Sequence, residues 1–218
     1  MTTTAGLLRT PQERLSAAFP AEIDATDFAL TLMASRHNIS PKRLAAPAPT
    51  EAQLLSLLSA AAAAPDHGQL TPWRFIVVPQ HRRHRLADAF AQALFDRDAA
   101  ATPEQLASAR EKAHRAPLLL VAIACLGPRE PDTPALERMV SMGAAIQNLL
   151  LAAHAMGYGA GLTSGRAMTS PRLARLCALA EGEVAVCCVN IGTATRHQPT
   201  TRERPLPAQF VSVLPDGD

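Results

Sequence analysis

Lysine is scarce in this sequence, so its positive charge is carried almost entirely by arginine: Lys42 and Lys112 are the only lysines among 21 basic residues. Charge of one sign is not in excess either, because 19 acidic residues leave a formal net charge of +2. This balance gives no reason to expect nucleic acid as a partner. The 48% of hydrophobic residues excludes a disordered chain. A guanidinium binds phosphate with planar, bidentate geometry, so arginines beside loops are the first candidates for binding an anion.

Long apolar runs are missing. The longest spans residues 118–126, which fits a buried strand and falls short of the roughly 18 to 20 residues that cross a bilayer. The N-terminal segment has no basic region followed by a long apolar stretch, which is the pattern of a secretory signal. We therefore expect a cytoplasmic protein that does not involve a membrane.

Paired cysteines and metal-ligand clusters are missing too. None of the four cysteines forms a Cys-x-x-Cys pair, and three lie inside apolar stretches, which favours buried structural thiols over a metal or disulfide role. His81 and His84 have the spacing of two ligands on a helix, but the arginines around them repel a cation, so we expect no metal site. The cysteines are Cys125, Cys177, Cys187 and Cys188.

Several signature motifs of catalysis are also absent. The sequence has no G-x-S-x-G elbow and no G-x-x-x-x-G-K-[ST] loop, which argues against a typical α/β hydrolase or P-loop NTPase. The glycines from Gly157 to Gly165 follow a helical pattern and lead into a strand, the reverse of the dinucleotide-binding arrangement. Two interpretations of this run stay open. Either Gly157 ends the helix in a left-handed conformation, or the later glycines let the backbone approach a flat ligand closely.

The hydrophobic pattern that is present predicts mixed α and β structure without internal repeats. Thr50 and Gln53 form a capping-box pattern at one helix start, and Thr102 with Pro103 marks another. Residues 140–156 are apolar on nearly every side, as in a helix that is central in its fold or buried between subunits. We expect helices near residues 27–36, 50–64, 81–95, 102–116 and 135–156, a short helix from 170, strands near 73–78, 118–125 and 183–191, and a short strand after the glycines.

Two polar segments are candidate ligand-binding loops. The basic segment 35–43 follows a helix, and its side chains either bind a phosphate or form a solvated loop. Residues 65–73 place two prolines, a glycine and several polar side chains between a helix and a strand. This second segment either presents groups to a ligand or is a plain turn.

Together these segments resemble the FMN-dependent nitroreductase family, in particular its small single-domain branch. The resemblance covers roughly residues 26–195 in order, and its most specific parts are the PDHxxxxPW and GYGxxxxSG patterns. The matching stretches are SRHNISPKRLAAPAPT (35–50), APDHGQLTPWRFIVV (64–78), RAPLLLVAIA (115–124), GAAIQNLLLAAHAMGYGAGLTSG (143–165) and GT (192–193).

The resemblance implies an α+β fold, with a central mixed sheet flanked by helices, that works as an intertwined homodimer with two FMN sites at the subunit interface. It divides the chain into an N-terminal extension (1–25), an FMN-binding domain (26–195) and a C-terminal arm of the same domain (196–218). The apolar residues 140–156 would then form the core of the dimer.

The resemblance also assigns cofactor-binding residues, and no separate catalytic side chain, because the flavin performs the redox chemistry. One group stands where relatives hold the FMN phosphate and ribityl chain, a second lies near the flavin ring, and a third contributes to the flavin face. Arg196, after the final GT, is a further candidate for the phosphate. The three groups are Arg36, His37 and Asn38; His67 and Gln69; and Leu162, Thr163 and Ser164.

The chain departs from the family pattern at two places. Close relatives have two arginines in the first motif, whereas here Arg36 is followed by His37 and Asn38, so Lys42 or Arg43 is expected to supply the missing charge. Close relatives often have a tryptophan-arginine pair where this chain has Leu162 and Thr163. That loop therefore offers the cofactor less charge and less aromatic surface.

The implied activity is that of an FMN-dependent oxidoreductase. NADH or NADPH would deliver hydride to the flavin, and a nitroaromatic, quinone or similar small acceptor would take the electrons in a ping-pong cycle. Two alternatives stay open: a related flavin enzyme with a different reaction, and a non-catalytic flavin-binding or interaction protein on the same fold.

Overall fold

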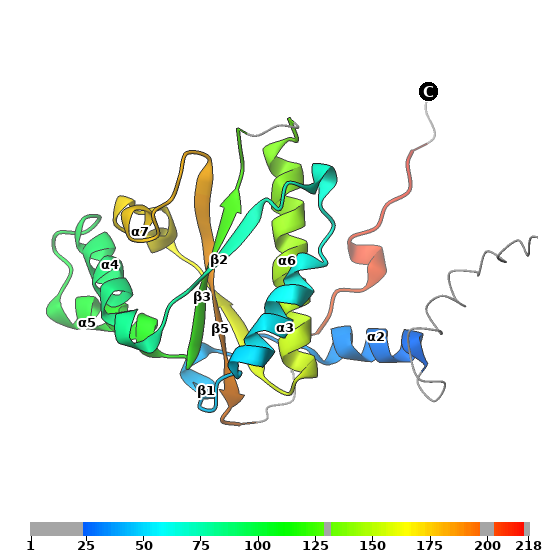
Figure 1. Ribbon diagram of the computed structural model, residues 1–218, viewed down its shortest axis with the longest axis horizontal. Coiled ribbons are helices and arrows are strands. Elements are labelled where there is room, and N and C mark those ends of the chain that lie inside the picture. Colours follow the sequence, from blue (N-terminus) through cyan, green and yellow to red (C-terminus); the bar gives the residue numbers. More distant parts are fainter. Residues whose placement is uncertain (1–23, 129–131, 197–202, 216–218) are drawn as a thin grey trace, which may run out of the picture.

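The computed structural model describes residues 24–128, 132–196 and 203–215. Within these ranges a five-stranded sheet is flanked by helices, which confirms the expected α+β class (Figure 1). The expected N-terminal extension falls almost wholly outside the described residues. The helices are α2 (Ala25–Ser35), α3 (Glu51–Ala62), α4 (Arg83–Phe95), α5 (Pro103–Glu111), α6 (Ala135–Ala155) and α7 (Pro171–Leu176). The strands are β1 (Leu44–Ala45), β2 (Trp73–Val77), β3 (Leu118–Cys125), β4 (Gly159–Thr163) and β5 (Glu183–Ala194).

The predicted helix starts are confirmed, with their caps. At the start of α3, Gln53 N donates to Thr50 Oγ1 (3.3 Å) and Thr50 N donates to Gln53 Oε1 (2.9 Å). The same reciprocal pair joins Thr102 and Gln105 at the start of α5. These bonds satisfy backbone N–H groups that have no partner inside the helix, so the first turn forms where the sequence places it.

The sheet is antiparallel at every described strand pair, and in this respect the expectation of a mixed sheet is wrong. Its order is β1-β5-β3-β2, and β4 pairs with β5 as well. Because β3 and β4 are both antiparallel to β5, they run in the same direction. β1 runs in this direction too, but β5 separates both β1 and β4 from β3, so no parallel pair forms among the described strands.

Strand β3 is buried on both faces, as its unbroken apolar sequence predicts. Its residues alternate between two cores because successive side chains point to opposite faces of a sheet. Leu120 and Ala122 pack with α3 and α6, whereas Leu119 and Val121 pack with α4 and α7 on the other face. The sheet therefore separates a layer containing α3 and α6 from a layer containing α4, α5 and α7 (Figure 1).

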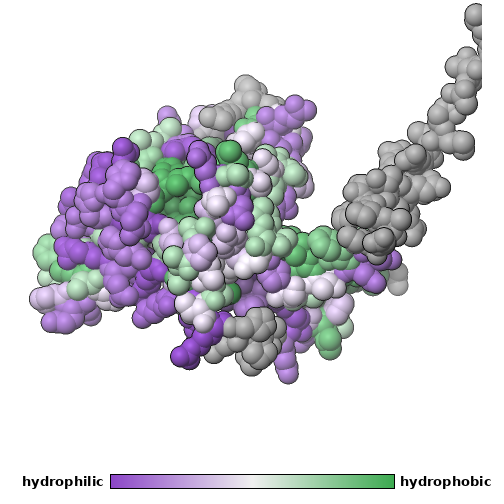
Figure 2. Space-filling model, turned by 60° about the horizontal axis from the view of Figure 1, so that its bottom comes forward, coloured by the Kyte–Doolittle hydropathy of each residue, from purple (hydrophilic) through white to green (hydrophobic). Residues whose placement is uncertain are grey.

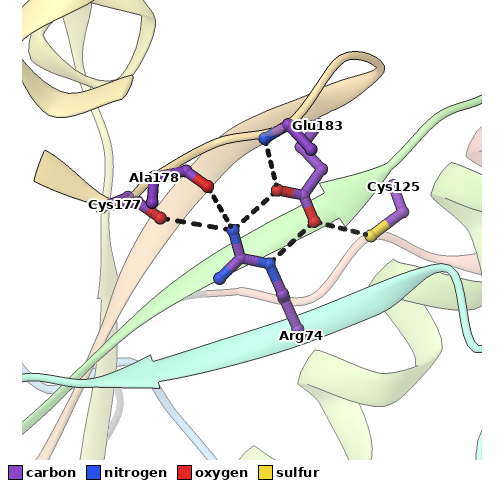
Figure 3. Close-up of polar contacts among 6 residues, drawn as sticks. Arg74, Cys125, Cys177, Ala178 and Glu183 are labelled. Carbon is purple, nitrogen blue, oxygen red and sulfur yellow. Dashed lines mark hydrogen bonds and ion pairs between the residues drawn. The ribbon is translucent and has the colours of Figure 1, made fainter. Parts of the chain in front are cut away.

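An ion pair between Arg74 and Glu183 ties strand β2 to the start of β5 (Figure 3). Arg74 Nε and Nη2 donate to the two carboxylate oxygens at 2.8 and 2.7 Å, which is the bidentate geometry. Nη2 also donates to the Cys177 carbonyl, and the Cys125 thiol donates to Glu183 Oε1 at 3.4 Å. The hydrogen bond from Arg74 is the main reason that the pKa of Glu183 is lowered to about 2.

Helix α6 buries only one side against the sheet. Met142, Ala145 and Leu149 are fully buried, whereas Leu136 and Val140 are 82% and 72% exposed. Helix α2 and the described part of the C-terminal arm, residues 203–215, project from the body (Figure 1), and a band of hydrophobic surface leads out along α2 (Figure 2). Exposed apolar side chains on these two segments are Phe28, Leu30, Met33, Leu206, Phe210, Val211, Val213 and Leu214.

Among the residues that the structure describes, no helix combines the length and the apolarity required to cross a membrane.

Candidate functional site

The segment that follows α2 lies along strand β4. Ile39 N donates to the Ala160 carbonyl (2.9 Å), and Leu162 N donates to Asn38 Oδ1 (3.0 Å). A side chain at Gly161 would overlap the Ile39 carbonyl, so only glycine allows this approach. The structure thus brings Asn38, from the first group of predicted site residues, against Leu162 from the third.

The first interpretation of the glycine run, termination of the helix at Gly157, is confirmed. Gly157 has φ +82° directly after α6, where it ends the helix in the left-handed region. Gly161 permits a close approach of another backbone segment, and the group packed against it is the carbonyl of Ile39 in the same chain. The later glycines therefore bring the two halves of the candidate site together.

Arg36 lies at the C-terminal end of α2 in an unusual electrostatic setting. Its Nε is buried and has no hydrogen-bond partner among the described residues. Arg204 of the C-terminal arm donates from Nη2 to the Arg36 carbonyl at 2.9 Å. Burial lowers the pKa of the Arg36 guanidinium, and the nearby Arg204 lowers it further. Two close cations, one with an unused buried donor, form a site to which an anion can bind.

His37 and His154 extend this basic cluster. Ser35 Oγ lies 2.8 Å from His154 Nε2, and His37 Nδ1 lies 3.2 Å from the Ser35 carbonyl. The pKa of His154 is lowered, first by burial and then by the charges of His37 and Arg36. A neutral imidazole at His154 adds no further repulsion to the cluster.

Thr163 and Ser164 are held in place by hydrogen bonds within the chain. Thr163 Oγ1 accepts from Nδ2 of the buried Asn190 (3.0 Å), and Ser164 Oγ donates to the Val186 carbonyl (3.0 Å). Both hydroxyls are thus engaged, and Ser164 is not oriented as a nucleophile toward a histidine. The fixed loop can present its backbone to a ligand.

A cavity of about 290 Å³ opens beside this loop, on the α4 side of the sheet. Thr163 and Ser164 line it, and Phe90, Leu119 and Met168 form part of its apolar wall. Four cationic side chains also line it: Arg97, Lys112, Arg115 and Arg166. Lys42 is close as well, because its charge contributes to lowering the pKa of Glu111, after the larger effect of Arg115.

Several of these residues carry no motif that would identify them in the sequence. Lys112 and Arg115 lie at the end of the helix expected near residues 102–116, and Arg204 lies in the arm, so no local motif connected them with Arg36 or Thr163. The scarcity of lysine was the available signal, because both lysines lie near this cavity. Arg196 forms no hydrogen bond or ion pair with any other described residue.

The loop before β2 is rigidly shaped. The Asp66 carboxylate accepts from the backbone N–H groups of Leu70 (3.1 Å) and Thr71 (2.7 Å). Gln69 and Thr71 have positive φ values of 53° and 45°, which non-glycine residues seldom adopt. The two hydrogen bonds to Asp66 hold these residues in that conformation.

His67 and Gln69 lie far from Arg36 within one chain. His67 Nδ1 is 2.7 Å from Glu137 Oε2 in the first turn of α6. Ser35, next to Arg36, contacts His154 near the other end of this helix. From residue 137 to 154 the helix rises about 25 Å. Figure 1 shows α2 at the end of α6 that is remote from the loop before β2. The predicted site residues therefore form two separate groups in a single chain.

All four cysteines are buried, as predicted for structural thiols, and none of them forms a disulfide with another described residue. Burial raises the pKa of Cys187 to about 11, and burial with neighbouring thiols raises that of Cys188 to about 12. These thiols stay protonated and are poor nucleophiles. Within the described ranges, no three His, Cys, Asp or Glu side chains are grouped as metal ligands would be.

Comparison with known proteins relates this geometry to one family. The model of the nitroreductase family matches residues 34–193, which include both Arg36–Asn38 and the 162–165 loop. A Haemophilus influenzae protein provisionally named NAD(P)H nitroreductase is 36% identical over 165 residues, which are 76% of this chain and 88% of that protein.

Solved structures show the same fold. The nitroreductase-like family protein from Bacillus cereus superposes with a TM-score of 0.71 at 21% identity, over 85% of this chain and 95% of that one. A variant of the FMN- and NADPH-dependent nitroreductase NfnB from a Sphingopyxis strain gives a TM-score of 0.65 at 18% identity, over 84% and 97%. The fold, the matched segments and the identity to a full-length relative agree: the chain belongs to the nitroreductase family.

Proposed function

We propose that this chain is an FMN-dependent oxidoreductase that passes electrons from NADH or NADPH to a small acceptor such as a nitroaromatic or a quinone. The observation that carries the proposal is the buried, unpartnered Nε of Arg36 beside the guanidinium of Arg204. A buried donor left without an acceptor costs about 1 to 3 kcal/mol. A phosphate dianion supplies that acceptor and offsets the repulsion between the two cations.

Asn38, in the same segment as Arg36, has hydrogen-bond donors that suit the ribityl chain of FMN. Asn38 uses Oδ1 to accept from Leu162 N, so its amide N–H groups are free to donate to ribityl hydroxyls. When bound, FMN supplies the redox chemistry, accepting hydride from the nicotinamide and giving electrons to the acceptor. The chain's own residues then have to bind and orient the ligands, and none of them has to act as a nucleophile.

The 162–165 loop is the proposed support for the flavin ring. Its hydroxyls are already engaged with Asn190 and Val186, and Leu162 N donates to Asn38, so the backbone N–H groups of Ser164 and Gly165 are the fixed donors left for the flavin. Fixed backbone donors stabilise developing negative charge without reorganising during the reaction. Lys112, on the rim of the adjoining cavity, adds a positive charge near the loop.

A second copy of the chain would complete the site. Exposed or half-buried positions recur along α6 at helical spacing, at residues 136, 140, 143, 147, 151 and 155. Two such helices can pack antiparallel along this stripe, and its midpoint lies between residues 145 and 146. Glu137 of one copy then faces residue 154 of the other, which brings the His67 loop of each protomer to the Arg36 cluster of its partner. This homodimer unites two groups of site residues that, in one chain, lie against opposite ends of α6, at residues about 25 Å apart along the helix axis.

An absorption spectrum of the purified protein, followed by FMN titration and anaerobic addition of NADH or NADPH, tests the proposal. We expect a flavin spectrum, one FMN per chain and bleaching by at least one nicotinamide. Reoxidation by a nitroaromatic or quinone then completes the cycle. A colourless dimer that does not bind added FMN contradicts every flavin-based role, whereas a flavin spectrum without bleaching favours a non-catalytic flavin protein.

A further inference from the structure

The cavity beside Thr163 has an apolar wall of the kind that binds an apolar group. Its floor is made by buried side chains from both sheet and helix, including Phe90, Leu119 and Met168. Its volume of about 290 Å³ is at the lower end of the range for small-ligand pockets. The thiol of Cys188, which also lines it, stays protonated because burial and the neighbouring thiols raise its pKa to about 12.

The rim of the same cavity is strongly positive. Arg97, Lys112, Arg115 and Arg166 come from three separate parts of the chain, and no described acidic residue lines the cavity with them. Arg115 is paired with Glu111 at 3.3 Å. The side chains of Arg97, Lys112 and Arg166 make no hydrogen bond or ion pair with any other described residue. Three unneutralised cations around one opening attract an anionic ligand and disfavour a cationic one.

From these two properties we infer that the cavity selects a planar aromatic acceptor that carries a negative charge, such as an aromatic carboxylate. The apolar floor takes the ring, and Arg97 and Arg166, which are exposed, meet the carboxylate at the opening. The prediction that a bound acceptor is reduced rests on the proposed function. Thr163 and Ser164 connect the two, because they belong both to the cavity wall and to the proposed flavin loop.

The proposed dimer leaves this cavity accessible. Leu119 and Cys188 in its wall face the α4 and α7 layer, whereas α6 packs on the opposite face of the sheet. A partner that packs along α6 therefore covers the other side of the sheet, and the rim cations stay exposed to an incoming acceptor.

Two nitroaromatics of nearly equal shape test the inference: 4-nitrobenzoate, which is anionic at neutral pH, and 4-nitrobenzamide, which is neutral. We expect kcat/KM of the FMN-loaded enzyme at low salt to favour the benzoate about tenfold, a preference that falls as salt screens the rim. In the double variant Arg97→Gln, Arg166→Gln the ratio should fall several-fold. In Arg85→Gln, which alters an exposed arginine of α4 outside the cavity, it should not change. Comparing ratios between variants removes the difference in intrinsic reactivity of the two compounds.

Calorimetric binding of the same two compounds to the protein without a nicotinamide separates this inference from the proposed function. If neither compound is reduced but benzoate binding still depends on Arg97 and Arg166, the cavity assignment stands and the proposed redox function fails. If both compounds are reduced and the double variant keeps the wild-type ratio, the cavity assignment is overturned and the redox function stands.

Discussion

Arg204 Nη2 donates a hydrogen bond to the carbonyl oxygen of Arg36 across 2.9 Å, and so brings the C-terminal arm to the end of α2. The arm reaches the candidate site although 168 positions separate the two residues in sequence. The contact places two cations together where one of them has a buried, unused donor. A bound phosphate would turn this unfavourable pair into a binding site, which makes both arginines direct targets for mutation.

Replacing either arginine should weaken FMN binding. We expect Arg36→Ala to raise the FMN dissociation constant by about 10- to 100-fold, because a hydrogen bond to a charged group contributes about 1.5 to 3 kcal/mol. Arg204→Ala should have a smaller effect in the same direction. Fluorescence titration with FMN measures both, and Arg85→Ala is the matched control. If both variants bind FMN with an affinity within about twofold of the wild type, the FMN phosphate does not bind at these two arginines.

The Arg74–Glu183 pair predicts a defined dependence of stability on pH. The pKa of Glu183 is about 2 in the folded chain, below its ordinary value of 4.5. Its stabilising contribution is therefore complete above pH 4.5 and is lost as the pH falls toward 2. Urea unfolding should show Glu183→Gln less stable than the wild type by about 2 kcal/mol at pH 7, and this difference should shrink below pH 4.5. A difference that stays constant down to pH 3 contradicts the assignment.

Gly161 should tolerate no side chain. A Cβ there would overlap the Ile39 carbonyl, so Gly161→Ala has to separate β4 from the segment that carries Arg36 and Asn38. We expect a loss of about 2 kcal/mol or more in unfolding free energy, of the order seen for overpacking, together with weaker FMN binding. Thermal unfolding measures the first effect and FMN titration the second. A variant with the wild-type melting temperature shows that the two segments are not packed as described.

The exposed side of α6 predicts how the dimer can be broken. Val140 is 72% exposed in the single chain, so Val140→Asp should leave the fold of the protomer intact. Placing a carboxylate in the proposed α6 contact should give monomers in sedimentation velocity, with FMN binding weakened as well. Phe95→Asp, at an exposed position at the end of α4, is the control and should remain dimeric. If the Val140→Asp protein remains dimeric, the dimer interface does not include this side of α6.

The elements of the fold could be predicted from local chemistry. Thr50 and Thr102 have cap partners three residues away, and the unbroken apolar run of β3 requires cover on both faces. Whether neighbouring strands run parallel or antiparallel was harder to predict from the sequence, because it depends on β5 lying between β3 and β4. The mixed sheet was expected from the family resemblance alone, because no local pattern in the sequence shows which strands are neighbours.

The site was predictable only in part for a related reason. Arg36, Asn38 and Leu162 were proposed as site residues because they lie in family motifs, and the structure joins Asn38 to Leu162 through one hydrogen bond. Lys112 and Arg204 have no motif, and they come near the site only through the tertiary fold. The His67 loop was predicted from the same family resemblance, yet a single chain holds it against Glu137, at the far end of α6.

Subunit complementation tests the central claim, that each site is built from two chains. One parent protein carries Arg36→Ala, and the other carries His67→Ala with Gln69→Ala; each homodimer should bind FMN poorly. In a mixed dimer purified with two different tags, one site receives both defects and the other receives none. We therefore predict one FMN bound per mixed dimer with wild-type affinity. If the mixed dimer binds FMN as poorly as its parents, the site lies within a single chain and the account is wrong.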